Sequence, residues 1–135
     1  MRVVLDTNVF ISAILGGKLS VFLDEWRAGQ FTLLVSEAII REYFDVINRP
    51  KFRFTAAEIT IIRDYLLRTA EFVTPTQTVT AVEADPSDNK FLEAALAGRA
   101  ICVVSGDKHL LNIGSFQDIE ILTAYDFIVL LEALR

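Results

Sequence analysis

Val3-Val4-Leu5-Asp6-Thr7-Asn8, near the beginning of the 135-residue chain, is an apolar run that ends abruptly in polar residues. The run contains β-branched residues and no polar alternation, which is typical of a strand buried on both faces of a sheet. Asp6, Thr7 and Asn8 are residue types that favour the position just before a helix. The stretch therefore predicts a strand over residues 2–5 that leads directly into a short helix over residues 9–15.

Two later segments place acids in a similar way. Ile101-Cys102-Val103-Val104 leads into Ser105-Gly106-Asp107-Lys108, and Asp85-Pro86-Ser87-Asp88-Asn89-Lys90-Phe91 opens an apolar helical stretch. In open α/β sheets, ligands bind at the carboxyl ends of the strands. We therefore expect Asp6, Asp88 and Asp107 at one edge of the sheet, where they indicate a metal-dependent site.

The rest of the chain alternates between strand-like and helix-like patterns. Further strands are expected over residues 31–35, 71–74, 100–104 and 119–122. Further helices are expected over residues 19–28, 37–47, 56–68, 87–97, 107–111 and 124–134. Gly16-Gly17 is expected to stop the first helix, and Gly98 the helix over residues 87–97. This alternation predicts an α/β layered fold with a mostly parallel sheet, and we expect residues 1–135 to form one domain.

The composition fits a folded protein with a sizeable core, since 53% of the residues are hydrophobic and 10 are Phe. No apolar run reaches the roughly 18 residues of a membrane-spanning helix, so we expect no membrane association. The one cysteine, Cys102, lies within an apolar strand-like run. A buried free thiol is typical of a reducing compartment, and we expect the protein in the cytoplasm.

The formal net charge of −5 argues against a partner with a dense phosphate backbone. That inference weakens if four ionised acids line one metal site, because they then account for four of the five net charges. A basic cluster, Arg49, Lys51 and Arg53, is interleaved with Phe52 and Phe54. Such a cluster suits nucleic acid, but a solvated loop is the more common explanation.

Clustered carboxylates indicate a bound cation for an electrostatic reason. Two carboxylates about 4 Å apart repel by roughly 4 kcal/mol at an effective dielectric constant near 20, so they take up a proton or a cation. Mg²⁺ and Mn²⁺ prefer such oxygen ligands, and two bound ions activate a water and stabilise the leaving oxygen of a phosphodiester. Taken singly, Asp6, Asp88 and Asp107 each have a structural explanation, as a helix cap or a first-turn acid. Three such acids at one sheet edge favour the metal site.

A fourth acid is expected from the helix over residues 37–47, which carries three candidates. On a helical wheel, Glu37 and Glu42 flank opposite edges of the apolar face, whereas Asp45 points further away. The wheel therefore excludes Asp45 and leaves Glu37 and Glu42 as alternatives.

Other common active-site chemistries fit the sequence poorly. His109 is the single histidine and is expected at a helix start, and Cys102 is expected within a strand, so a nucleophile–histidine pair is disfavoured. The sequence has no glycine-rich phosphate-binding loop of the common types. Asp6-Thr7-Asn8 lacks the second Asp expected of an aspartyl-phosphate phosphatase.

Taken in order, four segments resemble the PIN-domain family, and the resemblance covers almost the whole chain. They are Val4-Leu5-Asp6-Thr7-Asn8-Val9, Ser36-Glu37 through Arg41-Glu42, Asp85-Pro86-Ser87-Asp88-Asn89-Lys90-Phe91 and Ser105-Gly106-Asp107-Lys108. The chain is similar in particular to the bacterial and archaeal VapC-like proteins, which are toxins of toxin–antitoxin systems. The resemblance implies a three-layer α/β/α fold around a mostly parallel sheet, and a single-strand-specific ribonuclease that uses Mg²⁺ or Mn²⁺.

The resemblance also implies roles for individual residues. It places the acids of the family, which hold one or two divalent ions, at Asp6, Glu42, Asp88 and Asp107. Glu42 is thereby chosen over Glu37. The supporting polar positions match Asn8 and Ser105, and Asp85 is an extra acid that binds metal through water. His109 stands where some relatives carry a further acid, which implies weak or substrate-dependent binding of a second ion.

These observations lead to the hypothesis of a metal-dependent endoribonuclease that is the toxin of a toxin–antitoxin pair. Its expected substrate is RNA, whose backbone Lys90 or Lys108 would contact. A protein antitoxin and a homodimer are expected from the resemblance alone. Two rival functions stay open: a catalytically degenerate PIN-like domain that binds RNA or protein, and a phosphohydrolase that acts on small molecules.

Overall fold

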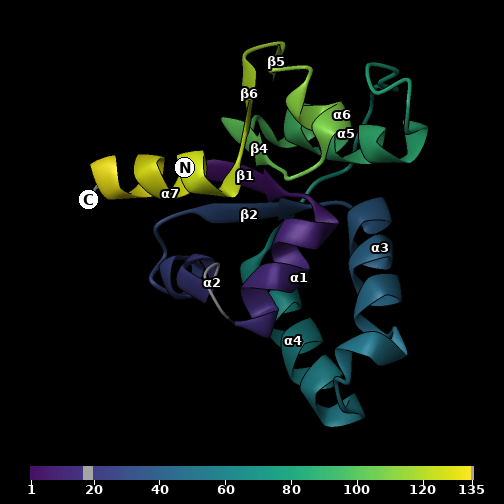
Figure 1. Ribbon diagram of the computed structural model, residues 1–135, viewed down its shortest axis with the longest axis vertical. Helices are drawn as coiled ribbons and strands as arrows, with labels where there is room; N and C mark the ends of the chain where they lie inside the picture. The colour runs from purple at the N-terminus through teal and green to yellow at the C-terminus, as the bar shows by residue number, and fades with distance from the viewer. Residues whose placement is uncertain (17–19, 135) are drawn as a thin grey trace.

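A six-stranded sheet lies at the centre of the computed structural model, which describes residues 1–16 and 20–134 (Figure 1). In chain order its strands are β1 (Arg2–Leu5), β2 (Thr32–Val35), β3 (Glu71–Phe72), β4 (Cys102–Val104), β5 (Ser115–Phe116) and β6 (Ile119–Leu122). They lie side by side in the order β3-β2-β1-β4-β6-β5. Neighbouring strands are parallel except β5 and β6, so the sheet is mostly parallel, as predicted.

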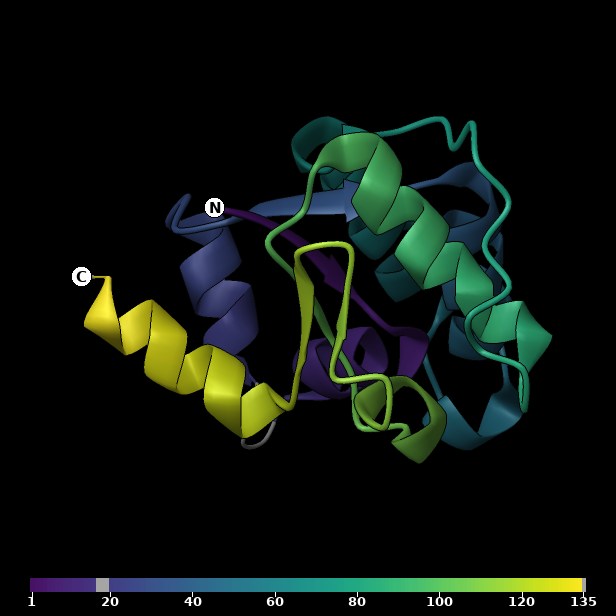
Figure 2. The same ribbon diagram turned by 90° about the horizontal axis from the view of Figure 1, so that it is seen from above.

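Helices cover both faces of this sheet. In chain order they are α1 (Thr7–Leu15), α2 (Ser20–Arg27), α3 (Glu37–Ile47), α4 (Ala56–Thr69), α5 (Asn89–Gly98), α6 (Lys108–Leu111) and α7 (Ala124–Ala133), with two 3₁₀ helices, η2 (Pro50–Phe52) and η3 (Pro86–Asp88). Figure 1 shows α1, α3 and α4 on one side of β1 and β2, and α5 and α6 on the other. Figure 2 shows α5 lying across the sheet. The expected α/β/α layering is therefore confirmed.

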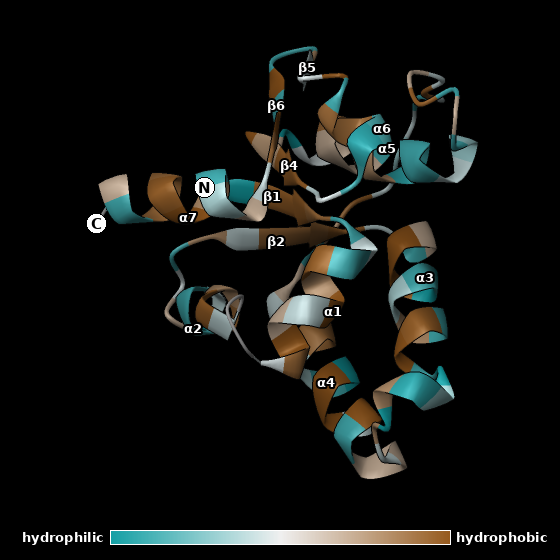
Figure 3. Ribbon diagram, in the orientation of Figure 1, coloured by the Kyte–Doolittle hydropathy of each residue, from teal (hydrophilic) through white to brown (hydrophobic). Residues whose placement is uncertain are grey.

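The central strands β1, β2 and β4 are largely hydrophobic (Figure 3). Each of β1, β2 and β4 has three consecutive buried residues, because helices pack on both faces. On one face, the rings of Phe10 in α1 and Tyr43 in α3 stack with their centroids 4.1 Å apart. The Tyr43 hydroxyl also donates a hydrogen bond to the carbonyl of Leu5 over 2.5 Å. These contacts fix α1 and α3 at the carboxyl end of β1.

Most helices begin at the caps that the sequence indicates. The side chains of Asp6, Ser36 and Thr123 accept hydrogen bonds from the first turns of α1, α3 and α7. At α4, both halves of the capping box between Thr55 and Glu58 are formed. Local side-chain chemistry therefore decides where these helices start.

Several predicted boundaries differ from the structure. The predicted helix over residues 87–97 begins as the 3₁₀ turn η3 and becomes α-helical only at Asn89. Gly98 is its last helical residue, and Arg99 ends the helix at φ 54°. A Cβ at position 98 would lie 2.6 Å from Leu34 Cδ1, so the close packing of Leu34 favours a glycine there. The two-residue strand β5 is too short to show a pattern in the sequence.

Other ends differ by one or two residues. The strand predicted over residues 71–74 ends at Phe72, and the strand predicted from residue 100 begins at Cys102. The predicted helix start at residue 19, and Gly17 in the predicted stop of the first helix, lie outside the described residues.

Taken alone, no helix in the described ranges is long and apolar enough to cross a membrane, although α1 and α2 together pass that test by length and composition. Much of the apolar surface of these two helices is buried in the core, including Phe10, Phe22 and Trp26.

Candidate functional site

The carboxyl ends of β1 and β4 bring two predicted site residues together. Leu5 pairs with Val104 in the parallel register, so the residues that follow them, Asp6 and Ser105, leave the sheet side by side. The Asp6 amide donates to the Val104 carbonyl over 3.0 Å. The Ser105 hydroxyl donates to Asp6 Oδ2 over 2.5 Å. The register of the sheet therefore fixes the Asp6 carboxylate at this edge.

Asp6 is a helix cap and a buried acid at the same time. Its Oδ1 accepts a hydrogen bond from the Val9 amide over 2.9 Å, and only 5% of the residue is exposed. Burial raises the pKa of Asp6, while hydrogen bonds from Ser105 and from the amides of Val9 and Gly106 oppose that rise. The carboxylate of Asp6 therefore caps α1 and also faces the site.

Asp85, Asp88 and Asp107 form an acidic cluster, in which one carboxylate oxygen of each lies within 4.8 Å of the others. The Asp107 amide donates to Ser105 Oγ over 2.9 Å. Burial, a hydrogen bond with Asp107 and the charges of Asp85, Asp107 and Glu42 raise the pKa of Asp88 to about 7. The same hydrogen bond lowers the pKa of Asp107, so the pair shares one proton near neutral pH.

Glu42 reaches the site from α3. Its Oε1 accepts a hydrogen bond from Lys90 Nζ in α5 over 2.5 Å, and its Oε2 accepts one from the hydroxyl of Thr7 in α1. Glu37, by contrast, leaves 80% of its side chain exposed and pairs with Arg41 on the surface. Of the two glutamates that the helical wheel leaves open, Glu42 is therefore the one that faces the other acids.

These side chains border a pocket of about 200 Å³. Its lining residues are Asp6, Thr7, Asn8, Glu42, Val46, Arg49, Asp88, Phe91 and Asp107. Two predicted residues contribute from its margin: Ser105 is buried and bonds to Asp6, and Asp85 belongs to the adjoining acidic cluster. The fold thus brings all of the predicted site residues to one place.

A larger cavity of about 570 Å³ adjoins the acidic pocket and shares Asn8 and Asp107 with it. Lys108 and His109 also line this cavity, and both are exposed. The His109 amide donates to Asp107 Oδ1 over 2.9 Å, so Asp107 is the N-cap of α6, and His109 lies in the first turn of that helix. The acidic pocket therefore opens next to a surface that carries basic side chains.

Three residues at the pocket have roles that no sequence pattern indicates. From the sequence, Thr7 is expected to cap a helix, and Arg49 is expected in a basic loop. Lys90 is expected in the first turn of a helix, where it would be free to contact RNA. Their contacts with the pocket arise where α1, α3 and α5 meet. The one available signal is proximity in the sequence, since Thr7 follows Asp6 and Lys90 comes shortly after Asp88.

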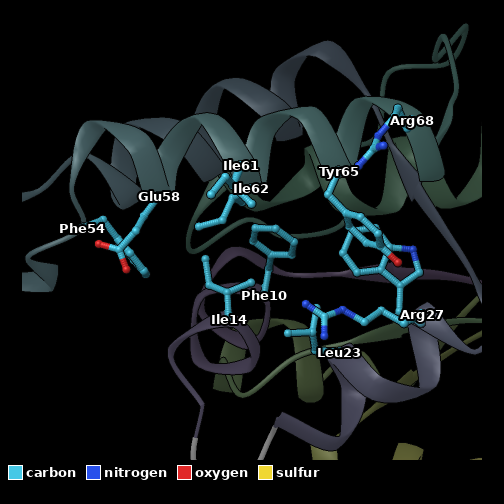
Figure 4. Close-up of a pocket in the computed structure, with 11 residues that line it drawn as sticks. Phe10, Ile14, Leu23, Arg27, Phe54, Glu58, Ile61, Ile62, Tyr65 and Arg68 are labelled. Carbon is cyan, nitrogen blue, oxygen red and sulfur yellow. The ribbon is translucent and has the colours of Figure 1, made fainter.

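A largely apolar depression of about 310 Å³ lies apart from the acidic pocket, between α1, α2 and α4 (Figure 4). Phe10 and Ile14 of α1 lie opposite Ile62 and Tyr65 of α4. None of the predicted site residues lines it.

The donor set of the acidic pocket fits a hard divalent cation. Mg²⁺ and Mn²⁺ prefer oxygen ligands, and the pocket offers carboxylates from separate parts of the chain. Burial, the hydrogen bond with Asp107 and the neighbouring negative charges raise the pKa of Asp88 and so favour its protonated form. A divalent cation at this place would satisfy the same charges as the proton.

Comparison with known proteins identifies the family. No curated protein matches the chain significantly. The family model of the PIN domain matches residues 2–109, a range that covers most of the chain and includes every predicted site residue. From the extent of this match, the chain belongs to the PIN domain family, whose members are in general metal-dependent nucleases.

Proposed function

We propose that the protein is a metal-dependent endoribonuclease that cleaves single-stranded RNA, and that it is the VapC-like toxin of a toxin–antitoxin pair. The observation that carries the proposal is the convergence of four acids on one pocket: Asp6, Glu42, Asp88 and Asp107. Membership of the PIN domain family supports a nuclease. The resemblance of the four sequence segments to VapC-like proteins supports RNA as the substrate and the toxin role.

In this proposal the four acids hold one or two Mg²⁺ or Mn²⁺ ions, and Asp85 acts through water. When bound, such ions activate a water and stabilise the leaving oxygen of a phosphodiester. Ser105 keeps Asp6 in place through its hydrogen bond to Oδ2. Asn8 offers an amide where the two cavities meet. His109 adds no carboxylate there, so a second ion is bound weakly or with substrate.

Basic side chains next to the acids support a phosphodiester substrate. Arg49 lines the acidic pocket, and Lys108 and His109 line the adjoining cavity. A strand that passes through both cavities meets cations in each of them, which offsets the net charge of −5. This arrangement favours a polymer over a single nucleotide, because the basic groups extend beyond the acidic pocket.

The proposed partners are a protein antitoxin and a second copy of the chain in a homodimer, and the proposed location is the cytoplasm. These parts of the proposal rest on the resemblance. Exposed apolar side chains on two helices are compatible with protein contacts: Ile61 on α4 and Tyr125 on α7.

The experiment that tests the proposal is cleavage of labelled single-stranded RNA by the purified protein with Mg²⁺ or Mn²⁺. Double-stranded RNA, single-stranded DNA and mononucleotide esters are offered in parallel. We expect cleavage of single-stranded RNA that is lost in Asp6→Asn. Turnover of the mononucleotide esters alone would support the small-molecule phosphohydrolase instead. Absence of cleavage together with absence of calorimetric Mn²⁺ binding would support the degenerate binding domain.

A further inference from the structure

Lys90 forms a half-buried ion pair at the edge of the acidic pocket. Its Nζ lies 2.5 Å from Glu42 Oε1, and 18% of the lysine side chain and 29% of the glutamate side chain are exposed. The ion pairs Arg2–Glu71 and Arg41–Glu37 are both more exposed. The Nζ also lies 5.6 Å from the centre of the Phe91 ring. Lys90 is therefore directed at Glu42 rather than into solvent.

Thr7 holds the second oxygen of the same glutamate. Its hydroxyl donates to Glu42 Oε2, and the residue is buried in the first turn of α1, directly after Asp6. A glutamate side chain has several rotatable bonds, so one contact leaves its carboxylate several orientations. Two donors from α1 and α5, one on each oxygen, select a single orientation toward the other acids.

We propose that Lys90 is a positioning residue that, together with Thr7, orients the Glu42 carboxylate for binding a divalent cation. The inference rests on the metal site of the proposed function. Each carboxylate oxygen has lone pairs beyond the one that accepts a hydrogen bond, so both contacts leave Glu42 able to ligate a metal. Groups that orient a metal ligand typically change metal affinity or activity by about 10–100-fold.

The positioning role and the positive charge of Lys90 predict opposite changes in the affinity for a divalent cation. Lys90 is a cation beside a pocket of acids, so charge alone predicts that its removal strengthens binding of a divalent cation. Loss of positioning predicts weaker binding, because an unrestrained Glu42 has to be ordered when it binds the ion. The sign of the change in metal affinity therefore separates the two roles.

Calorimetric titration of Mn²⁺ into the full chain is the test. Lys90→Met is expected to weaken Mn²⁺ binding by about 10–100-fold, and Lys90→Arg to restore most of the affinity. Thr7→Val removes the hydroxyl without changing the charge, and is expected to weaken binding in the same direction. Lys51→Met is the matched control, since it removes an exposed lysine that lines neither the acidic pocket nor the adjoining cavity, and it is expected to leave the Mn²⁺ affinity unchanged.

A Glu42→Gln background provides the second readout. If Lys90 acts through Glu42, then Lys90→Met changes the Mn²⁺ affinity little in that background. Unchanged or tighter Mn²⁺ binding by Lys90→Met, or an equal loss in the Glu42→Gln background, overturns the positioning role and leaves the nuclease proposal standing. If Lys90→Met does not fold, unchanged binding by Thr7→Val overturns it. Failure of the wild-type chain to bind Mn²⁺ overturns the metal site and this inference together.

Discussion

Ser105 and Asp6 are joined by a hydrogen bond between two buried side chains, with 2.5 Å between Ser105 Oγ and Asp6 Oδ2. The same hydroxyl oxygen accepts a hydrogen bond from the Asp107 amide over 2.9 Å. One serine at the end of β4 therefore links two acids of the pocket. The placement of these acids depends on a residue that carries no charge.

Ser105→Ala is expected to lower the free energy of unfolding by about 1–3 kcal/mol, because it leaves a buried carboxylate oxygen and an amide without their partner. The Ser105 hydrogen bond lowers the pKa of Asp6, so that pKa rises further in the variant. Urea unfolding measures the stability, and NMR titration of labelled carboxyl carbons measures the pKa. The control is Ser115→Ala, at an exposed serine of β5. An unchanged pKa of Asp6 in Ser105→Ala would show that the hydroxyl does not stabilise the ionised acid.

The raised pKa of Asp88, about 7, predicts a dependence of stability on pH. An acid with a higher pKa in the folded chain than in the unfolded chain is protonated more in the folded state between about pH 4 and pH 7. Stability therefore falls as pH rises through this range. Asp88→Asn removes the titrating group and therefore this loss of stability at high pH. With a chelator present, we expect the variant to raise the melting temperature more at about pH 8 than at about pH 5.

Asp24→Asn, at an exposed acid of α2 that lines neither the acidic pocket nor the adjoining cavity, removes the same charge and is the control for this comparison. Because Asp107 shares the proton of Asp88, the transition belongs to the pair. Mn²⁺ competes with that proton and is expected to raise the wild-type melting temperature more at about pH 8 than at about pH 5. An equal effect of Asp88→Asn at both pH values would contradict the shared proton.

Tyr43→Phe tests how α3 is held at the end of β1. The variant keeps the ring that stacks on Phe10 and loses the hydrogen bond to the Leu5 carbonyl. We expect the free energy of unfolding to fall by about 0.5–1.5 kcal/mol, measured by urea unfolding. Tyr125→Phe, at a residue that is 74% exposed, should leave it unchanged. Equal stability of the two variants would show that the hydroxyl of Tyr43 does not help to hold α3 at the end of β1.

The basic residues beside the acids are tested by the salt dependence of RNA binding. Each phosphate contact with single-stranded RNA contributes about −0.7 to the slope of log affinity against log salt concentration. In an Asp6→Asn background that prevents cleavage, Arg49→Ala and Lys108→Ala are each expected to reduce the slope by about that amount. Lys51→Ala, whose side chain lies over the ring of Phe52, is the control with the same loss of charge. Slopes equal to that of the control would mean that RNA follows another path.

The features that could be predicted from sequence depend on local chemistry. The apolar run before Asp6 indicates a buried strand, and the capping types after it indicate a helix start, without reference to the rest of the chain. Once the strands are parallel, the acids at their carboxyl ends lie at one edge. The structure places Asp6 and Ser105 side by side for this reason.

The features that could not be predicted depend on contacts between distant segments. Glu37 and Glu42 both flank the apolar face of α3, and only the packing of α3 against α1 turns Glu42 toward the acids. The contact between Lys90 and Glu42 joins residues 48 positions apart and leaves no local pattern. Gly98 has the sequence pattern of a helix stop, yet it is the last residue of α5 and packs closely against the side chain of Leu34. The orientation of these side chains is therefore determined by tertiary packing, which local sequence patterns do not encode.

Cleavage of a fluorescent single-stranded RNA in the presence of Mn²⁺ tests most directly whether these acids form a metal-dependent nuclease site. We predict that the wild-type chain and Asp24→Asn cleave at equal rates, and that a chelator stops both. We predict that Asp107→Asn is slower by about 100-fold or more, since changes to groups that only orient a ligand already reach about 10–100-fold. Cleavage by Asp107→Asn at the wild-type rate, or undiminished cleavage with the chelator present, would contradict the assignment.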